Sequence, residues 1–260
     1  MNREEHIKFI KSDLAEVLQD TVASINLLGD GLEFYAVNNY VLQSLLLQMT
    51  GAQEQKMKCI CWEMATDNLA YRYKRYYKKW DLSECSTHAD KTKVYEDLCK
   101  AIKVYDSAYK LFIDDNDKKT LLQYVLVKID SIFENTNIQR IHLLKYKEFK
   151  TIWQNLLAAN IAYPSLKNIF HIRQGHTENP FEDMQTDEVL YTIYSLLYKA
   201  RNRYAHNATS YQMNLPRFYE INDEKYQKYN NIFLFYAELL LIDEMFRKLF
   251  DKYQSVVEFA

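Results

Sequence analysis

Glycine and proline are nearly absent from this chain, which has only 4 glycines and 3 prolines in 260 residues. Sheet proteins need many tight turns, and those turns depend on these two residue types. Their scarcity therefore argues against a sheet fold and predicts an all-α protein. Apolar residues make up 48% of the sequence, which is enough for a substantial core.

The chain also has little net charge, no disulfide pattern and no long apolar run. The net charge of −2 argues against a general nucleic-acid coat, so any RNA contact must come from a local basic patch. The four cysteines (Cys59, Cys61, Cys85 and Cys99) match neither a disulfide framework nor a zinc ribbon. No run reaches the roughly 18 apolar residues of a membrane span, and residues 1–6 lead into an amphipathic stretch. We expect a cytoplasmic protein with reduced cysteines and no membrane partner.

Apolar periodicity predicts an antiparallel bundle of about nine helices. We place them at 3–27, 32–50, 52–79, 89–113, 118–133, 139–159, 164–171, 187–207 and 222–255. Gly29 to Gly31 separates the first two helices. Ser86 or Thr87 can cap the helix predicted over 89–113. Residues 1–260 are expected to form one domain, in which 1–86 could be an N-terminal helical subdomain.

The helix predicted over 187–207 carries the most informative residues, Arg201, Asn202 and His206. An imidazole can accept or donate a proton near neutral pH. A guanidinium can bind a phosphate and stabilise the charge that builds on it during transfer. An apolar stripe places the helix against a core, at Val189, Ile193, Leu196, Leu197, Ala200 and Tyr204. A polar stripe lies on the other side, at Ser195, Lys199, Asn202 and His206.

Helix geometry separates Arg201 from His206. Five residues correspond to about 140° around a straight helix, so one helix does not easily direct both groups at one phosphate. A bend near His206 would bring them closer. A homodimer would do so better, because the arginine of each subunit could meet the histidine of the other. The alternative is that Arg201 is a solvated or ion-paired helix residue and that His206 complements the helix C-terminus.

The segment Arg201-Asn202-Arg203-Tyr204-Ala205-His206 resembles the Arg-x(4–6)-His motif of the HEPN superfamily. The resemblance covers about residues 118–255 and implies an all-α core of a metal-independent endoribonuclease, typical of toxin–antitoxin and antiviral defence systems. It implies Arg201, Asn202 and His206 as catalytic residues, RNA as substrate, a homodimer, and an antitoxin or defence-complex partner. Two residues after the histidine, where related toxins often carry a modified tyrosine, this chain has Ala208.

Other basic residues are candidates for RNA contact. In the segment 71–80, Arg72, Arg75 and Lys79 form a stripe that we expect to be solvated. A second stripe of Leu69, Tyr73, Tyr76 and Trp80 is expected to face the core, in which case the segment is an ordinary basic helix end. Further candidates are Lys199, Arg203, Arg173 and His176.

Two functions therefore remain open at this point. The first is a HEPN-type ribonuclease that needs neither a metal nor a cofactor. The second is a non-catalytic helical interaction module, such as a regulatory subunit of a defence complex, that uses the same surface to bind a partner.

Overall fold

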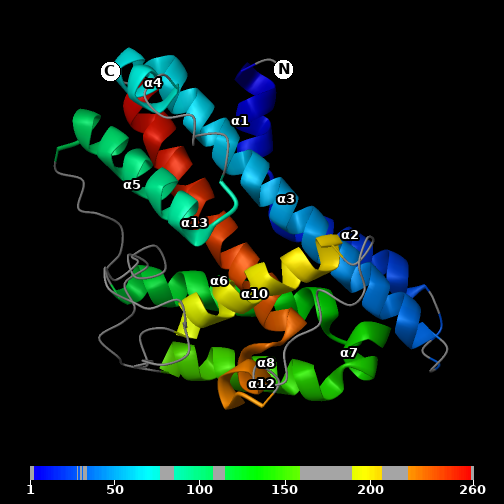
Figure 1. Ribbon diagram of the computed structural model, residues 1–260. Coiled ribbons are helices and arrows are strands. Elements are labelled where there is room, and N and C mark those ends of the chain that lie inside the picture. Colours follow the sequence, from blue (N-terminus) through cyan, green and yellow to red (C-terminus); the bar gives the residue numbers. More distant parts are fainter. Residues whose placement is uncertain are drawn as a thin grey trace.

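The computed structural model describes residues 3–27, 29, 31, 34–76, 85–107, 115–158, 189–206 and 222–258. Within these ranges every regular element is a helix, which confirms the all-α prediction (Figure 1). The helices are α1 (Arg3–Lys11), α2 (Leu14–Asn26), α3 (Tyr35–Asp67), α4 (Leu69–Tyr76), α5 (His88–Tyr105), α6 (Asp115–Phe133), α7 (Asn137–Ile141), α8 (Leu143–Ala158), α10 (Val189–His206), α12 (Glu224–Tyr229) and α13 (Ile232–Glu258). The helix predicted over 164–171 lies outside the described residues.

The long helix α3 corrects a predicted break at Gly51. We expected one helix to end at residue 50 and another to begin at 52, but α3 continues through this glycine to Asp67. A glycine inside a helix costs only about 1 kcal/mol relative to alanine. Buried residues on both sides of the glycine, including Met49 and Met57, anchor the helix and outweigh that cost.

Three other predicted helices are each divided in two, and in two of them a polar side chain at the junction caps the second part. Asp13 accepts a hydrogen bond from the Ala15 amide at 2.9 Å and separates α1 from α2. Thr136 caps α7, which ends at Ile141 before α8 begins. Asn231 separates α12 from α13, where its side-chain oxygen accepts from the Phe233 amide at 3.0 Å. The predicted cap Thr87 is confirmed, and it forms a capping box with Asp90.

Helix α13 occupies the middle of the molecule (red and orange in Figure 1) and contacts α3, α5, α6, α8 and α10. Its residues from Phe233 to Phe246 are buried on every side, as expected of a helix in the interior of a bundle. The Tyr236 hydroxyl donates to the Leu42 carbonyl of α3 at 2.7 Å, which satisfies a fully buried polar group. Buried apolar side chains form one cluster that extends from Ile10 to Tyr253.

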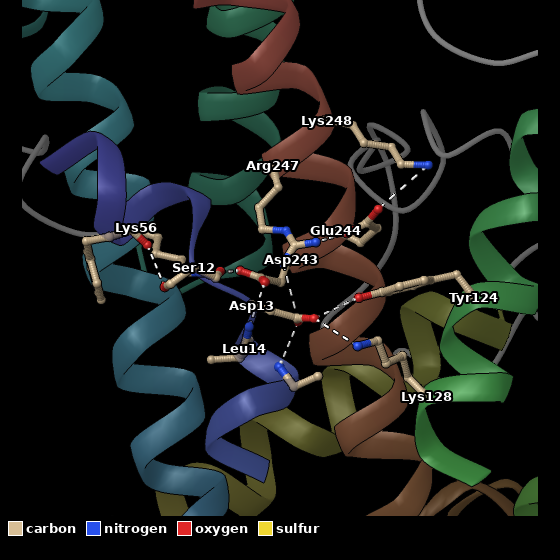
Figure 2. Close-up of polar contacts among 12 residues, drawn as sticks. Ser12, Asp13, Leu14, Lys56, Tyr124, Lys128, Asp243, Glu244, Arg247 and Lys248 are labelled. Carbon is tan, nitrogen blue, oxygen red and sulfur yellow. Dashed lines mark hydrogen bonds and ion pairs between the residues drawn. The ribbon is translucent and has the colours of Figure 1, made fainter. Parts of the chain in front are cut away.

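A polar network joins the α1–α2 junction to α3, α6 and α13 (Figure 2). The Lys56 ammonium lies 2.7 Å from the Asp243 carboxylate, and both side chains are only 3% exposed. Lys56 also donates to the Ser12 carbonyl, and the Leu14 amide donates to Asp243 at 3.1 Å. The chain can therefore turn between α1 and α2 because buried charges satisfy the backbone groups that the break exposes.

A second part of this network surrounds Asp13. Its carboxylate accepts from the Tyr124 hydroxyl at 3.0 Å and lies 3.2 Å from Lys128 and 3.3 Å from Arg247. Burial acts to raise the pKa of Asp13, but the Ala15 amide and these cations outweigh it and hold the pKa below its usual value. Asp13 therefore stays ionised and connects α2, α6 and α13.

No helix in the described part of the chain combines the length and the apolar character needed to cross a membrane.

Candidate functional site

Helix α10 carries the Arg–His motif and packs across α3 and α13 (yellow in Figure 1). The predicted apolar stripe is confirmed at Ile193, Leu196, Leu197 and Ala200, which are fully buried. Val189 and Tyr204 at the two ends pack partly buried against the same core. The motif therefore lies at the end of a helix whose position is fixed by its apolar face.

The predicted polar stripe is less exposed than expected. Its members Ser195, Lys199 and Asn202 are half-buried, and so is the neighbouring Arg203. Among residues 189–205 only Ala205 is exposed. Lys199 and Arg203 remain candidates for RNA contact, but only part of each side chain can reach a ligand. His206 is the last residue of α10, and its side chain lies outside the described residues.

The Arg201 guanidinium makes one hydrogen bond and one longer ionic contact. Its guanidinium donates to the side-chain oxygen of the adjacent Asn202 at 3.0 Å. It also lies 3.9 Å from the carboxylate of Glu54 on α3, at the long end of the range for an ion pair. The Arg201 side chain keeps 30% of its surface exposed. These contacts orient the guanidinium while leaving part of it open to a ligand.

A small pocket adjoins Arg201 where α10 meets α3 and the start of α5. Glu54, Ser86, Lys91 and Tyr198 line it together with Arg201. Lys91 is buried and donates to the Cys85 carbonyl at 2.9 Å. Burial lowers the pKa of the Lys91 ammonium to about 8, while nearby acidic groups oppose the shift. The pocket thus combines two cationic side chains with one carboxylate.

The first residue of α5, His88, packs against the N-terminal part of α10. Its ring meets the rings of Tyr191 and Tyr194 edge-to-face, with centroids 5.0 and 5.3 Å away. Burial lowers the pKa of His88 to about 4, and the neighbouring Lys91 contributes to the shift. The Tyr194 hydroxyl donates to the Ser86 carbonyl at 3.0 Å, so the α5 N-terminus is attached to α10 by both ring packing and a hydrogen bond.

Helix α4 presents the opposite face to the one predicted from the sequence. Arg75, expected in a solvated stripe, is 4% exposed and lies 2.9 Å from Asp97 of α5. Its guanidinium also lies 6.0 Å from the centre of the Tyr71 ring. Leu69 and Tyr73, expected in the core, are 75% and 59% exposed. The prediction is therefore wrong for Leu69, Tyr73 and Tyr76, and for Arg75, whose partner on α5 draws it inward, whereas Arg72 is exposed as predicted.

The RNA-contact candidates have different outcomes. Arg75 is buried and paired, so it cannot serve as a phosphate contact, whereas Arg72 is exposed. Lys79, Arg173 and His176 lie outside the described residues.

Sequence reasoning missed Glu54 and Lys91, the charged neighbours of Arg201 on other helices. Glu54 is 147 residues away along the chain, and nothing in its local sequence distinguishes it from other surface acids. Within the described ranges, no group of three or more histidine, cysteine or acidic side chains is arranged to hold a metal ion.

No protein-family model, curated protein or solved structure was found to match this chain.

Proposed function

We propose that the chain is a metal-independent endoribonuclease of the HEPN type, acting in bacterial defence or as a toxin. The observation that supports this best is the partly exposed Arg201 guanidinium, which Asn202 orients near the end of a core-packed helix whose last residue is His206. A positioned guanidinium stabilises the charge of a phosphoryl transition state, and an imidazole transfers the proton.

In this mechanism the RNA 2′-hydroxyl attacks the adjacent phosphorus. The 2′-oxygen to phosphorus bond forms and the bond to the 5′-oxygen breaks, which leaves a 2′,3′-cyclic phosphate and a 5′-hydroxyl. His206 removes the proton from the attacking hydroxyl or donates one to the leaving oxygen. Arg201 stabilises the charge on the non-bridging oxygens, and Asn202 orients the phosphate or the imidazole. We propose that a homodimer combines the arginine of one subunit with the histidine of the other.

The test is cleavage of RNA in excess chelator by the purified chain. We expect His206→Ala and Arg201→Ala each to abolish cleavage, and DNA to be inert because it lacks the 2′-hydroxyl. Arg140→Ala is a matched control, since Arg140 is an exposed arginine of α7. A mixture of Arg201→Ala and His206→Ala subunits should regain part of the activity if each site draws on two chains. Cleavage by His206→Ala at the wild-type rate would exclude the mechanism.

Glu54→Gln distinguishes a catalytic arginine from a structural one. If Arg201 binds the phosphate, this variant should retain cleavage, because it removes only a 3.9 Å pairing. If Arg201 serves to hold α10 against α3, Glu54→Gln and Arg201→Ala should lower the melting temperature alike.

The second candidate is a non-catalytic helical interaction subunit. It is favoured by the contacts of Arg201 with Asn202 and Glu54, which are also those of a structural arginine. The absence of cleavage by a folded dimer, together with unaltered stability of Arg201→Ala, would favour a partner-binding role for this surface.

A further inference from the structure

An exposed aromatic surface lies at the junction of α3 and α4. It consists of Trp62 near the end of α3 and Leu69, Tyr73 and Tyr76 on α4; we call it the α3–α4 aromatic surface. The rings of Trp62 and Tyr76 meet edge-to-face with centroids 6.2 Å apart, and the two side chains are 51% and 41% exposed. A group of large apolar side chains at the surface is typical of an interaction site.

The charge of this surface is positive. Arg72 and Lys74 project from the same short helix, are exposed, and have no acidic partner among the described residues. The carboxylates nearby on α3 are already paired: Glu54 lies 2.8 Å from Lys58, and Glu63 and Asp67 both bind Arg3. Within the described part of the chain, Arg72 therefore acts on the Tyr76 ring, Lys74 lies on the side of the same helix that faces α5, and the carboxylates nearby are already paired.

We propose that the α3–α4 aromatic surface binds single-stranded RNA. Bases stack on Trp62, Tyr73 and Tyr76, while Arg72 and Lys74 contact the phosphates. Rings interleaved with cations are the arrangement that holds a single strand without reading its sequence, because every base offers a face for stacking. An exposed lysine beside the arginine favours RNA over a protein partner, because lysine is depleted at protein–protein interfaces. The inference rests on the proposed function in taking RNA as the ligand.

The location of this surface suits the proposed cleavage site. Trp62 follows Glu54, the α3 neighbour of Arg201, by eight residues, which is a rise of about 12 Å and a turn of about 80° along one helix. In Figure 1, α4 lies at the end of α3 and α10 crosses α3 nearer to its middle. A strand bound on the aromatic surface can therefore continue along α3 toward Arg201 within the same subunit.

The experiment measures the affinity for a short 2′-O-methyl oligouridylate, which cannot be cleaved, by fluorescence anisotropy on the full chain. We expect Trp62→Ala and Tyr76→Ala each to weaken binding about five-fold or more, the lower end of the measured range for loss of one stacked base. Tyr40→Ala is the matched control, because Tyr40 is an exposed tyrosine on the same helix α3. Its affinity should equal that of the wild type.

The contribution of charge is measured separately from the salt dependence of binding. Arg72→Gln with Lys74→Gln should reduce the slope of log affinity against log salt by about 0.7 for each phosphate that is no longer neutralised. Lys8→Gln, at an exposed lysine of α1, should leave the slope unchanged. Circular dichroism of each variant establishes that the helices are retained.

Unchanged affinity of the Trp62→Ala/Tyr76→Ala double variant would overturn the inference. So would equal weakening by Tyr40→Ala, since the effect would then not belong to this surface. If the double variant loses self-association in sedimentation but keeps RNA affinity, the surface is a contact between copies of the chain and the inference is wrong. Binding that depends on Trp62 in a wild-type chain that does not cleave RNA would overturn the proposed function and leave this inference standing.

Discussion

The buried ion pair between Lys56 and Asp243 provides the sharpest test of how this fold is held together. Each side chain is 3% exposed, and the two charged atoms are 2.7 Å apart. We expect Lys56→Met to destabilise the protein by about 3–5 kcal/mol, because it leaves the Asp243 carboxylate buried with the Leu14 amide as its main donor. That is a large part of the roughly 5–15 kcal/mol total stability of a typical domain.

The matched control is the surface pair of Lys11 with Asp251. These groups are 2.9 Å apart, close to the distance in the buried pair, but they are 44% and 57% exposed. Lys11→Met should cost no more than about 1 kcal/mol, because an exposed pair gains little in water. Urea unfolding followed by circular dichroism measures both costs. Equal costs for the two variants would refute the argument that burial, and not the short distance, makes the pair important.

The double variant Lys56→Met/Asp243→Leu distinguishes the interaction between the two charges from the contribution that each side chain makes through other neighbours. Removing both charges avoids an unpaired buried carboxylate, so the double variant should cost less than the sum of the single substitutions. A residual cost of about 1–3 kcal/mol is expected, since the Leu14 amide is left without its acceptor. An additive result would mean that the two groups contribute independently.

Two further predictions concern the pH dependence of stability. Burial lowers the pKa of His88 from 6.5 to about 4, so stability should fall by up to about 3 kcal/mol as the pH falls across that interval. His88→Phe keeps a ring against Tyr191 and Tyr194 and should flatten this dependence in urea titrations; an equally steep curve would contradict it. Glu238 should give the opposite pH dependence of stability. Burial raises its pKa well above 4.5, so stability should fall as the pH rises above that value. Glu238→Gln cannot ionise, so its advantage over the wild type should grow with pH in the same assay, and a constant difference would exclude this role.

The parts of the fold that could be predicted are those that depend on local sequence. Few turn-forming residues predict helices, the spacing of Ile193, Leu196 and Ala200 predicts the buried face of α10, and Thr87 predicts a cap. The errors occur where distant residues decide the outcome. Gly51 reads as a break in isolation, yet α3 continues through it because packing on both sides favours the helix.

Helix α4 shows the same limit of sequence-based prediction, although it has only 8 residues. Its amphipathic pattern offers two possible buried faces, and the aromatic one is the natural choice from hydrophobicity. The cation Arg75 faces inward instead because Asp97, 22 residues further along the chain, lies where its charge can be compensated. A burial pattern that depends on one long-range ion pair cannot be derived from helical periodicity.

The contrast between Arg75 and Arg201 explains why the second is the better candidate for catalysis. Arg75 is 2.9 Å from its carboxylate and 4% exposed, so releasing it would leave a buried charge unpaired at a cost of several kcal/mol. Arg201 is 3.9 Å from Glu54 and 30% exposed, so a phosphate can replace that weak pairing at little cost. Glu54 also has Lys58 at 2.8 Å and would keep a partner after the exchange. An arginine that must exchange its ligand during turnover needs a weak ion pair. Of these two ion pairs, only Arg201 with Glu54 is weak enough for that exchange.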